Sequence, residues 1–488
     1  MDRPNVILIM TDQQRADTVG ALGAPWMQTP NLDRLVREGT AFTNCFVTSP
    51  VCVGARSSLF SGVYPHATGI FSNFQPWEPT WVRWLADAGY HCVNIGKMHI
   101  NPYHALGGFH QRFVVENKDR PLFLEEHERA FHDEWDKALH ARKLIKPTRY
   151  TRFERDPDGF RQALGAFDWD IDEDMHPDFF VGDTALWWLE ERKADTPLFL
   201  QIGFPGPHPP YDPVARYADL YRDAAIPVPA VSEEELANQP PAQAELRQNM
   251  IKFNIDSIAW REDASVEDLL RIRRYYAANV TMIDDKVGAI MEVLKQKGYL
   301  DNALVIFTSD HADALGDHGH IQKWTMYDTV ARVPLILWSP GHVPQGRVDD
   351  SLVQLMDIAP TITRAAGVAV PDQWEATPLP GISGTTGDTP ARQVVYSELG
   401  RDHIQTGAEF MVMRRDSDWK LVYYLGESDG ELYDLTSDPD EMQNLWRSHD
   451  HREKKAELLL DLHEWSVAGT HRTSQPSTLK PQAPMQID

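Results

Sequence analysis

Two acidic residues follow short apolar runs, and each stands next to a second residue of a type that binds metal ions. Asp12 and Gln13 follow the run "NVILIMT", and Asp310 and His311 follow "ALVIFTS". Oxygen donors with one imidazole suit Ca²⁺, Mg²⁺ or Mn²⁺ better than a structural zinc ion. If both runs are strands of one sheet, the two pairs could bind one ion, although each pair taken alone is more often a strand-end turn.

A cysteine stands where the sequence indicates the start of a helix. Cys52 comes just before "GARSSLFSG", and unpaired N–H groups at a helix start favour an anion and lower the pKa of a thiol. Arg56, one turn later, adds a fixed positive charge. The pattern fits either a functional thiol or a cysteine that only packs at a helix start. Cys45 and Cys92 lie in apolar, strand-like runs, which is typical of small buried side chains.

Strand-like and helix-like segments alternate along most of the chain. We expect buried strands at Asn5–Asp12, His91–Gly96, Leu198–Phe204 and Ala303–His311. Helical patterns cover 29–39, 183–193, 267–298 and 351–367. This alternation predicts an α/β fold in which helices cover both faces of a large sheet.

The C-terminal part of the sequence indicates a second, smaller domain. A linker rich in Pro, Gly and Thr spans 370–390, and strand-like runs follow at 409–415, 419–424 and 430–435, before a terminal helix and a polar tail from residue 470. We expect a catalytic domain over 1–367 and a small α+β domain with an antiparallel sheet over 368–488. The long irregular segments 117–174 and 228–248 are expected to form walls of an active site.

Composition narrows the class of protein. The formal net charge of −25 over 488 residues argues against nucleic acid or an anionic membrane as a partner. Only five apolar residues precede Thr11, too few for a signal segment or a membrane span, so we expect a cytoplasmic protein. An anionic substrate would need a locally positive pocket.

Several motifs together resemble the sulfatases of the alkaline phosphatase superfamily, from end to end and in the order seen there. They are "NVILIMTDQQ", "TPNLDRLVREGTAFTN", "SPVCVGARSSLFSG", "GYHCVNIGKMH", "GPHPPY", "FTSDHADALGDHG" and "ELYDLTSDPDEMQNL". The resemblance implies an alkaline-phosphatase-like α/β fold with a large mixed, mostly parallel sheet and a small C-terminal antiparallel-sheet domain. It also implies one divalent ion, commonly Ca²⁺, and a cysteine oxidised after translation to formylglycine. The expected reaction is hydrolysis of a small-molecule sulfate monoester to inorganic sulfate and an alcohol.

The resemblance also implies roles for single residues. The metal ligands would be Asp12, Gln13, Cys52, Asp310 and His311, with Cys52 as the formylglycine precursor and nucleophile. The catalytic and sulfate-binding residues would be Arg56, which holds the nucleophile, Lys97 and His99, which flank it, and His208 and Lys323, one of which would be an acid for the leaving alkoxide. Such a cluster of donors would stabilise the charge of a transferring sulfuryl group. Each residue alone would more often be a surface lysine or a packed histidine.

One position departs from the family pattern. Cys52 is followed by Val53, Gly54, Ala55 and Arg56, whereas the family has proline where Gly54 stands. That proline is part of what the cysteine-oxidising enzymes recognise in the extended nascent chain, and glycine is far more flexible there. If Cys52 stays a thiol, the chain could be a slow hydrolase, an enzyme using an unmodified cysteine, or a weakly catalytic protein that binds sulfate esters.

A related group, the phosphonate monoester hydrolases and phosphodiesterases, shares the "DQ" and "SDH" pattern. That group usually has hydroxylic residues where Lys97 and His99 stand in "GKMH", so the resemblance favours sulfate monoesters. A phosphate monoester or a sulfamate would also suit these residue types. We further expect a homo-oligomer, a dimer or a tetramer.

Overall fold

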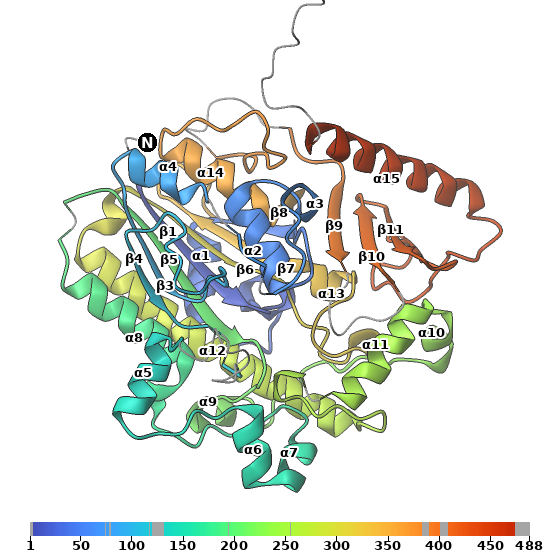
Figure 1. Cartoon of the computed structure of the whole chain (residues 1–488), viewed down its shortest axis with the longest axis horizontal. Coiled ribbons are helices and arrows are strands. Elements are labelled where there is room, and N and C mark those ends of the chain that lie inside the picture. Colours follow the sequence, from blue (N-terminus) through green and yellow to red (C-terminus); the bar gives the residue numbers. More distant parts are fainter. Residues whose placement is uncertain are drawn as a thin grey trace, which may run out of the picture.

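The structure is a computed structural model that describes residues 3–73, 75–77, 80–116, 118–119, 131–193, 195–253, 255–382, 390–400 and 408–473. Figure 1 shows a large α/β body beside a smaller antiparallel sheet that carries the last helix. The large sheet has eight strands in the order β4-β3-β5-β1-β6-β7-β2-β8. Its strands are β1 (Asn5–Asp12), β2 (Thr40–Phe46), β3 (His91–Gly96), β4 (Gln111–Val114), β5 (Leu198–Pro207), β6 (Ala303–Ser309), β7 (Arg332–Trp338) and β8 (Arg347–Gln354).

Strand direction confirms the mixed, mostly parallel sheet. β1 pairs in parallel with β5 on one side and β6 on the other, and β3 pairs in parallel with β4 and β5. β7 is antiparallel to both of its neighbours, β6 and β2, while β2 and β8 are parallel. All strands except β7 therefore run the same way, and their carboxyl ends meet at one edge of the sheet.

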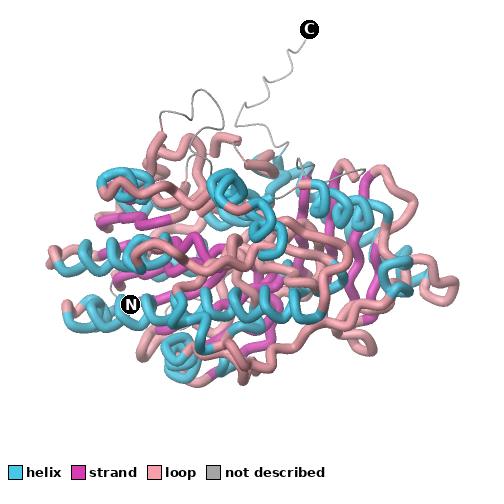
Figure 2. The backbone as a smooth tube through the Cα atoms, turned by 90° about the horizontal axis from the view of Figure 1, so that it is seen from below, coloured by secondary structure: helices cyan, strands magenta, loops and turns pink. Residues whose placement is uncertain are grey.

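Helices cover both faces of this sheet, as Figure 2 shows from below. The alternation of side chains along β1 divides its apolar residues, because Val6, Leu8 and Met10 enter one core while Ile7 and Ile9 enter the other. The helices of this body before β5 are α1 (Pro30–Glu38), α2 (Cys52–Ser61), α3 (Pro65–Thr68), α4 (Val82–Asp87), α5 (Glu134–Ala141), α6 (Arg149–Arg155), α7 (Pro157–Ala163) and α8 (Pro177–Glu190). The later ones are α9 (Ala215–Leu220), α10 (Glu233–Asn238), α11 (Pro241–Lys252), α12 (Val266–Gln296), α13 (Asp328–Ala331) and α14 (Ile358–Ala365).

The small C-terminal sheet is antiparallel throughout. Its order is β12-β11-β10-β9, and its strands are β9 (Val395–Gly400), β10 (Phe410–Arg415), β11 (Trp419–Leu425) and β12 (Glu431–Asp434). The terminal helix α15 (Arg452–Thr473) packs on one face through Leu458 and Leu462. The other face contributes Met411, Met413 and Val422 to a core shared with the large sheet.

Several expected elements need correction. The segment 351–367 is not one helix, because its first residues belong to β8 and α14 starts only at Ile358. The long segments expected to be irregular contain short helices, α5 to α7 in one and α10 and α11 in the other. Helix α15 extends three residues past position 470, and the predicted polar tail beyond it lies outside the described residues.

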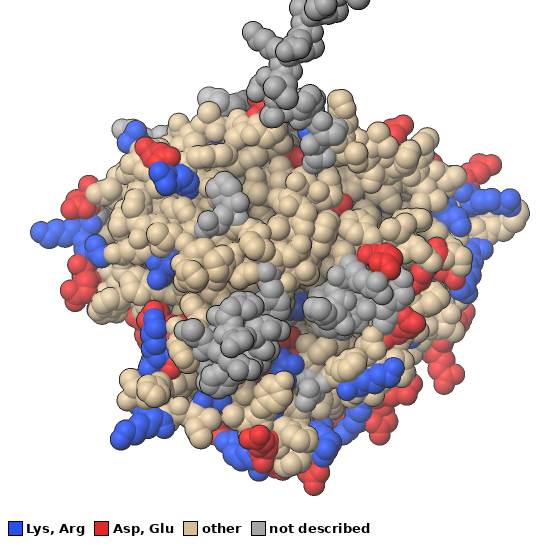
Figure 3. Space-filling view, in the orientation of Figure 1, with Lys and Arg blue, Asp and Glu red and all other residues tan. Residues whose placement is uncertain are grey.

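Surface charge and helix length bear on possible partners. Figure 3 shows acidic and basic side chains interspersed and mostly toward the rim of one face. The net charge of −25 is therefore not gathered in a single acidic patch on that face. Among the helices of the described residues, none combines the length and apolar character needed to cross a membrane.

Candidate active site

The site lies at the carboxyl edge of the large sheet, where several adjacent strands end in polar residues. Asp12 is the last residue of β1, and Asp310 follows directly after β6. Lys97 follows β3 and His208 follows β5. Because the strand order is β3-β5-β1-β6, these four residues come from neighbouring strands although they are far apart in sequence.

Cys52 reaches the same place from the first turn of α2. The residue before it, Val51, has extended backbone angles and makes no side-chain cap, so Cys52 is the first helical residue. The N–H groups of a first helical turn have no partner within the helix, and they favour negative charge on the Cys52 side chain. The helix ends at Gly62, whose positive φ of 76° lets its N–H bond to the Ser58 carbonyl.

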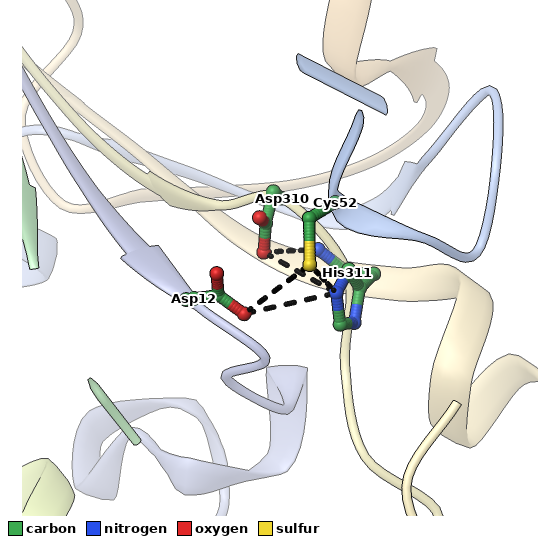
Figure 4. A group of neighbouring side chains, drawn as sticks. All are labelled: Asp12, Cys52, Asp310 and His311. Carbon is green, nitrogen blue, oxygen red and sulfur yellow. Dashed lines mark hydrogen bonds and ion pairs between the residues drawn. The ribbon is translucent and has the colours of Figure 1, made fainter. Parts of the chain in front are cut away.

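Four buried side chains form a cluster of metal-binding type (Figure 4). Asp12, Cys52, Asp310 and His311 each present one ligand atom, and these atoms all lie within 4.8 Å of one another. Cys52 Sγ is 3.1 Å from His311 Nε2 and 3.8 Å from Asp12 Oδ1. His311 Nδ1 faces the Ala312 carbonyl at 3.0 Å, so the proton belongs on Nδ1 and Nε2 keeps its lone pair.

Gln13 supplies the strongest sign that an ion fits this cluster. Its Nε2 donates to Asp313 Oδ2 at 2.7 Å, while its Oε1 is buried with no hydrogen-bond partner among the described residues. A buried amide oxygen without a partner is costly unless something coordinates it. Two carboxylates, one imidazole and one amide oxygen make a donor set that suits a hard divalent cation.

Two cations hold the carboxylates of the cluster. Arg56 Nε donates to Asp310 Oδ2 at 2.7 Å, and Arg56 Nη2 lies 3.6 Å from Asp12 Oδ2. The Lys97 ammonium forms an ion pair with the same Asp12 oxygen. Burial alone would raise the pKa of Asp12, but the charges of Lys97 and Arg56 outweigh it and lower that pKa well below its usual value. The Asp12 carboxylate is therefore ionised.

A lysine beside the cysteine is hydrogen bonded to a histidine. Lys323 Nζ is 3.3 Å from Cys52 Sγ and 3.1 Å from His208 Nε2. His208 Nδ1 faces the Pro209 carbonyl at 2.8 Å, so Nε2 accepts a hydrogen bond from the ammonium. Burial, and then the charge of Lys323, lower the pKa of His208 well below its usual value, so this imidazole is neutral.

The three cysteines differ sharply in acidity. Burial would raise the pKa of Cys52, and Asp12 adds to that, yet the charges of Lys323 and Lys97 lower it overall. Burial raises the pKa of Cys45 well above its usual value and that of Cys92 to about 12. The described residues thus provide an anion-stabilising environment at Cys52, whereas Cys45 and Cys92 are packing residues, as expected from sequence.

His99 is close to the cluster, but its backbone conformation and hydrogen bonds differ from those of the other expected residues. Its backbone is left-handed with φ 60°, and its N–H donates to Glu116 at 3.3 Å. Burial, and then Lys97, lower the pKa of His99 to about 3, so the ring is neutral. Its Nδ1 is buried with no hydrogen-bond partner among the described residues.

The geometry adds two residues that sequence reasoning missed. Asp256 Oδ2 lies 3.5 Å from His208 Nε2, and Asp313 contacts Gln13. Asp256 lies in an insertion with no motif of its own, so no sequence signal pointed to it. Asp313 lies two residues past His311, within the motif "FTSDHADALGDHG". Its role could not be predicted because its partner Gln13 is distant in sequence.

Comparison with known proteins shows which family the chain resembles. The family model described as Sulfatase matches residues 4–368, and the model described as N-sulphoglucosamine sulphohydrolase, C-terminal, matches residues 316–468. An arylsulfatase of Clostridium perfringens is 29% identical over 93% of this chain and 92% of its own length. A choline-sulfatase of Rhizobium meliloti is 28% identical over 91% of this chain and 82% of its own.

A solved structure, that of the phosphonate monoester hydrolase of Agrobacterium radiobacter, superposes with a TM-score of 0.77 at 26% identity, and it covers 96% of each chain. The fold and site therefore define an alkaline-phosphatase-like hydrolase. Because the Sulfatase model matches well over half of the residues, the chain belongs to the sulfatase family. It is a sulfuric ester hydrolase.

Proposed function

We propose that this chain hydrolyses sulfate monoesters through a nucleophile derived from Cys52, with the help of one divalent metal ion. The observation that carries the proposal is the surroundings of Cys52 Sγ, which lies 3.3 Å from Lys323 Nζ, 3.1 Å from His311 Nε2 and 4.0 Å from Lys97 Nζ. The two ammonium groups beside this atom suit an anionic nucleophile that attacks an anionic ester.

Asp12, Gln13, Asp310 and His311 would hold the ion, and the side chain derived from Cys52 would complete the set. Ca²⁺ is the first candidate, with Mn²⁺ and Mg²⁺ as alternatives, because oxygen donors predominate. When bound, such an ion lowers the pKa of a coordinated hydroxyl and neutralises charge on the ester oxygens. Arg56 would hold the Asp12 and Asp310 carboxylates in place through its ion pairs with both.

We further propose that Cys52 is converted to formylglycine, whose hydrate carries two hydroxyl groups. One hydroxyl oxygen would attack sulfur, the ester S–O bond would break, and the alkoxide would leave with a proton. The other hydroxyl would then lose its proton, the bond to the sulfated oxygen would break, and sulfate would leave as the aldehyde is regenerated. The thiol Sγ of the structure stands in for the attacking oxygen.

The chain's own residues suit the proton movements of these steps. Lys323 is hydrogen bonded to His208 and faces Cys52, so this pair could deliver a proton to the leaving alkoxide. Burial opposes protonation of Lys323, but Cys52 and Asp256 raise its pKa overall, so it stays charged and stabilises negative oxygens. The ring nitrogens of neutral His208 already bond to the Pro209 carbonyl and to Lys323, whereas Nδ1 of neutral His99 has no partner among the described residues and could make one hydrogen bond to the ester.

Close packing around position 54 favours glycine there, whether or not the protein has lost activity. A Cβ atom at position 54 would lie 2.5 Å from Ser49 Oγ and 2.6 Å from Ser49 Cβ. A proline or alanine would therefore collide with Ser49 in this fold. Close packing against Ser49 is therefore a reason for glycine at this position, separate from the recognition of the nascent chain on which conversion of Cys52 depends.

A panel of substrates tests the proposal against the related enzyme class. An aryl sulfate, a phosphate diester and a phosphonate monoester with the same leaving group would be assayed at equal concentrations. We expect the sulfate to be fastest, since Lys97 adds a cation beside the nucleophile. If a diester or phosphonate is faster by orders of magnitude, the chain is a phosphonate monoester or phosphodiester hydrolase. If nothing turns over while sulfate esters bind, it is a binding protein.

Three expectations from sequence stay predictions. They are the boundary between domains at residues 367 and 368, the cytoplasmic location and the homo-oligomeric state. A wider panel of sulfate esters would identify the alcohol portion of the substrate.

A further inference from the structure

Asp313 is a buried carboxylate that the reaction proposed above does not use. It lies just after the metal-type pair Asp310 and His311, and it accepts four hydrogen bonds. Oδ1 accepts from the backbone N–H groups of Leu315 at 3.0 Å and Gln322 at 2.9 Å. Oδ2 accepts from Gln13 Nε2 and from the Tyr211 hydroxyl, each at 2.7 Å.

These contacts join three segments of the active site. Gln13 follows Asp12 at the end of β1, and Tyr211 lies three residues after His208. Gln322 immediately precedes Lys323. One carboxylate therefore anchors the segment with a metal ligand, the segment with the neutral histidine, and the segment with the lysine that faces Cys52.

The chemistry of the Gln13 contact fixes which end of the amide faces the cluster. A carboxyl oxygen that accepts a hydrogen bond must face a donor, so the atom of Gln13 that faces Asp313 Oδ2 must be the NH₂ group. The amide oxygen is then directed away from Asp313, where it is buried without a hydrogen-bond partner among the described residues. Only the oxygen of an amide binds a hard cation, so this orientation is the one that metal binding needs.

We propose that Asp313 is a positioning residue that orients the Gln13 amide so that its oxygen can bind the metal ion. The inference rests on the metal site of the proposed function. Groups that orient metal ligands in this way typically change metal affinity by about 10- to 100-fold when they are lost.

The substitution Asp313→Asn tests the orientation directly. Oδ1 accepts two backbone N–H groups, so the new amide would keep its oxygen there and place its NH₂ group opposite the NH₂ group of Gln13. Two donors would face each other, and the Gln13 amide would have to turn its own NH₂ toward the cluster. We expect Ca²⁺ affinity of the metal-stripped protein, measured by calorimetric titration, to fall by about 10- to 100-fold.

A double-mutant cycle separates this role from simple loss of a negative charge. In a Gln13→Met background there is no amide to orient, so adding Asp313→Asn should change Ca²⁺ affinity by less than about threefold. An equal loss in both backgrounds would overturn the proposal. Tyr211→Phe serves as a matched control, since it removes one hydrogen bond to the same oxygen without reversing any donor, and it should keep affinity within about threefold of the unmutated protein.

A swap of polarity provides the rescue. In Gln13→Glu with Asp313→Asn, the new amide donates to the new carboxylate, whose second oxygen is free for the ion, and the total charge is unchanged. This protein should fold and bind Ca²⁺ within about tenfold of the unmutated chain. Failure of this double variant to bind Ca²⁺ would overturn the proposal. The test holds even where Asp313→Asn alone does not fold. If the unmutated protein binds neither Ca²⁺ nor Mn²⁺, the metal site fails and this inference fails with it, whereas normal binding by Asp313→Asn refutes only the role of Asp313.

Discussion

The Nζ atom of Lys323 lies 3.3 Å from the Sγ atom of Cys52, although 271 residues separate them in the chain. Lys97 Nζ approaches the same sulfur at 4.0 Å. Both lysines are buried, and for both the nearby anions outweigh burial and raise the pKa above its usual value. Two permanently charged ammonium groups therefore face the position from which the nucleophile would attack.

Removal of either lysine should affect chemistry more than binding. Lys97→Ala or Lys323→Ala is expected to lower kcat for an aryl sulfate by about a hundredfold or more, because a donor to developing negative charge is lost. KM should change much less. Lys137→Ala is the control, since that side chain is exposed and pairs only with Glu134 among the described residues. Unchanged kcat in both active-site variants would refute the role given to these lysines.

Metal removal should abolish activity reversibly. Asp12 and Asp310 are buried next to each other, and an ion between them would offset their mutual repulsion and coordinate the buried Gln13 Oε1, which has no hydrogen-bond partner among the described residues. We expect chelation to stop turnover, added Ca²⁺ or Mn²⁺ to restore it, and Asp310→Asn to prevent the restoration. Crystals grown with either ion that left Asp12, Gln13, Asp310 and His311 without density for a metal would contradict this account.

Substitution of Gly54 should destabilise the fold through Ser49. Alanine is the better helix former, yet Gly54→Ala should lower the free energy of unfolding by about 1–3 kcal/mol, because the new methyl group meets both Ser49 Oγ and Ser49 Cβ. Denaturant unfolding measures the loss. Ser49→Gly in the same chain should recover most of it. A Gly54→Ala protein as stable as the unmutated one would show that Ser49 moves away freely.

His66 should make stability depend on pH. This residue of α3 places Nδ1 3.0 Å from the Glu398 carboxylate of β9 and Nε2 3.9 Å from Glu375. Burial opposes protonation, but the hydrogen bond and charge of Glu398 raise the pKa of His66 above its unfolded value of 6.5. The added stability is therefore complete below pH 6.5 and is lost as pH rises through the folded-state pKa.

The measurement is Tm between about pH 6 and pH 9, for the unmutated chain and for His66→Gln. The difference in Tm between the two should shrink as the pH rises. His91→Gln is a suitable control, because burial lowers the pKa of His91 instead. Parallel pH profiles for the unmutated chain and His66→Gln would show that the contact with Glu398 does not couple to folding.

The strands that end at the site could be predicted from sequence, but the order of those strands in the sheet could not. Apolar runs ending in Asp12 or Asp310 indicate buried strands because such runs are only stable in a covered sheet. That β1 lies between β5 and β6 depends on pairing across hundreds of residues, which local patterns do not contain. The same applies to Asp313, whose contact with Gln13 spans 300 residues. The sequence pattern favours a helix at residues 351–354, which belong to β8, because a short apolar run fits both the helical and the strand period.

The central claim, that a group derived from Cys52 is the nucleophile, is tested by measuring activity and aldehyde content in the same preparations. Peptide mass spectrometry of residues 48–62 gives the aldehyde fraction, and turnover of an aryl sulfate gives the activity. We predict that activity rises in proportion to the aldehyde fraction and that Cys52→Ala is inactive while it keeps its fold. Near-normal turnover by Cys52→Ala would contradict the assignment of the nucleophile, and full activity of an unmutated protein without aldehyde would contradict formylglycine.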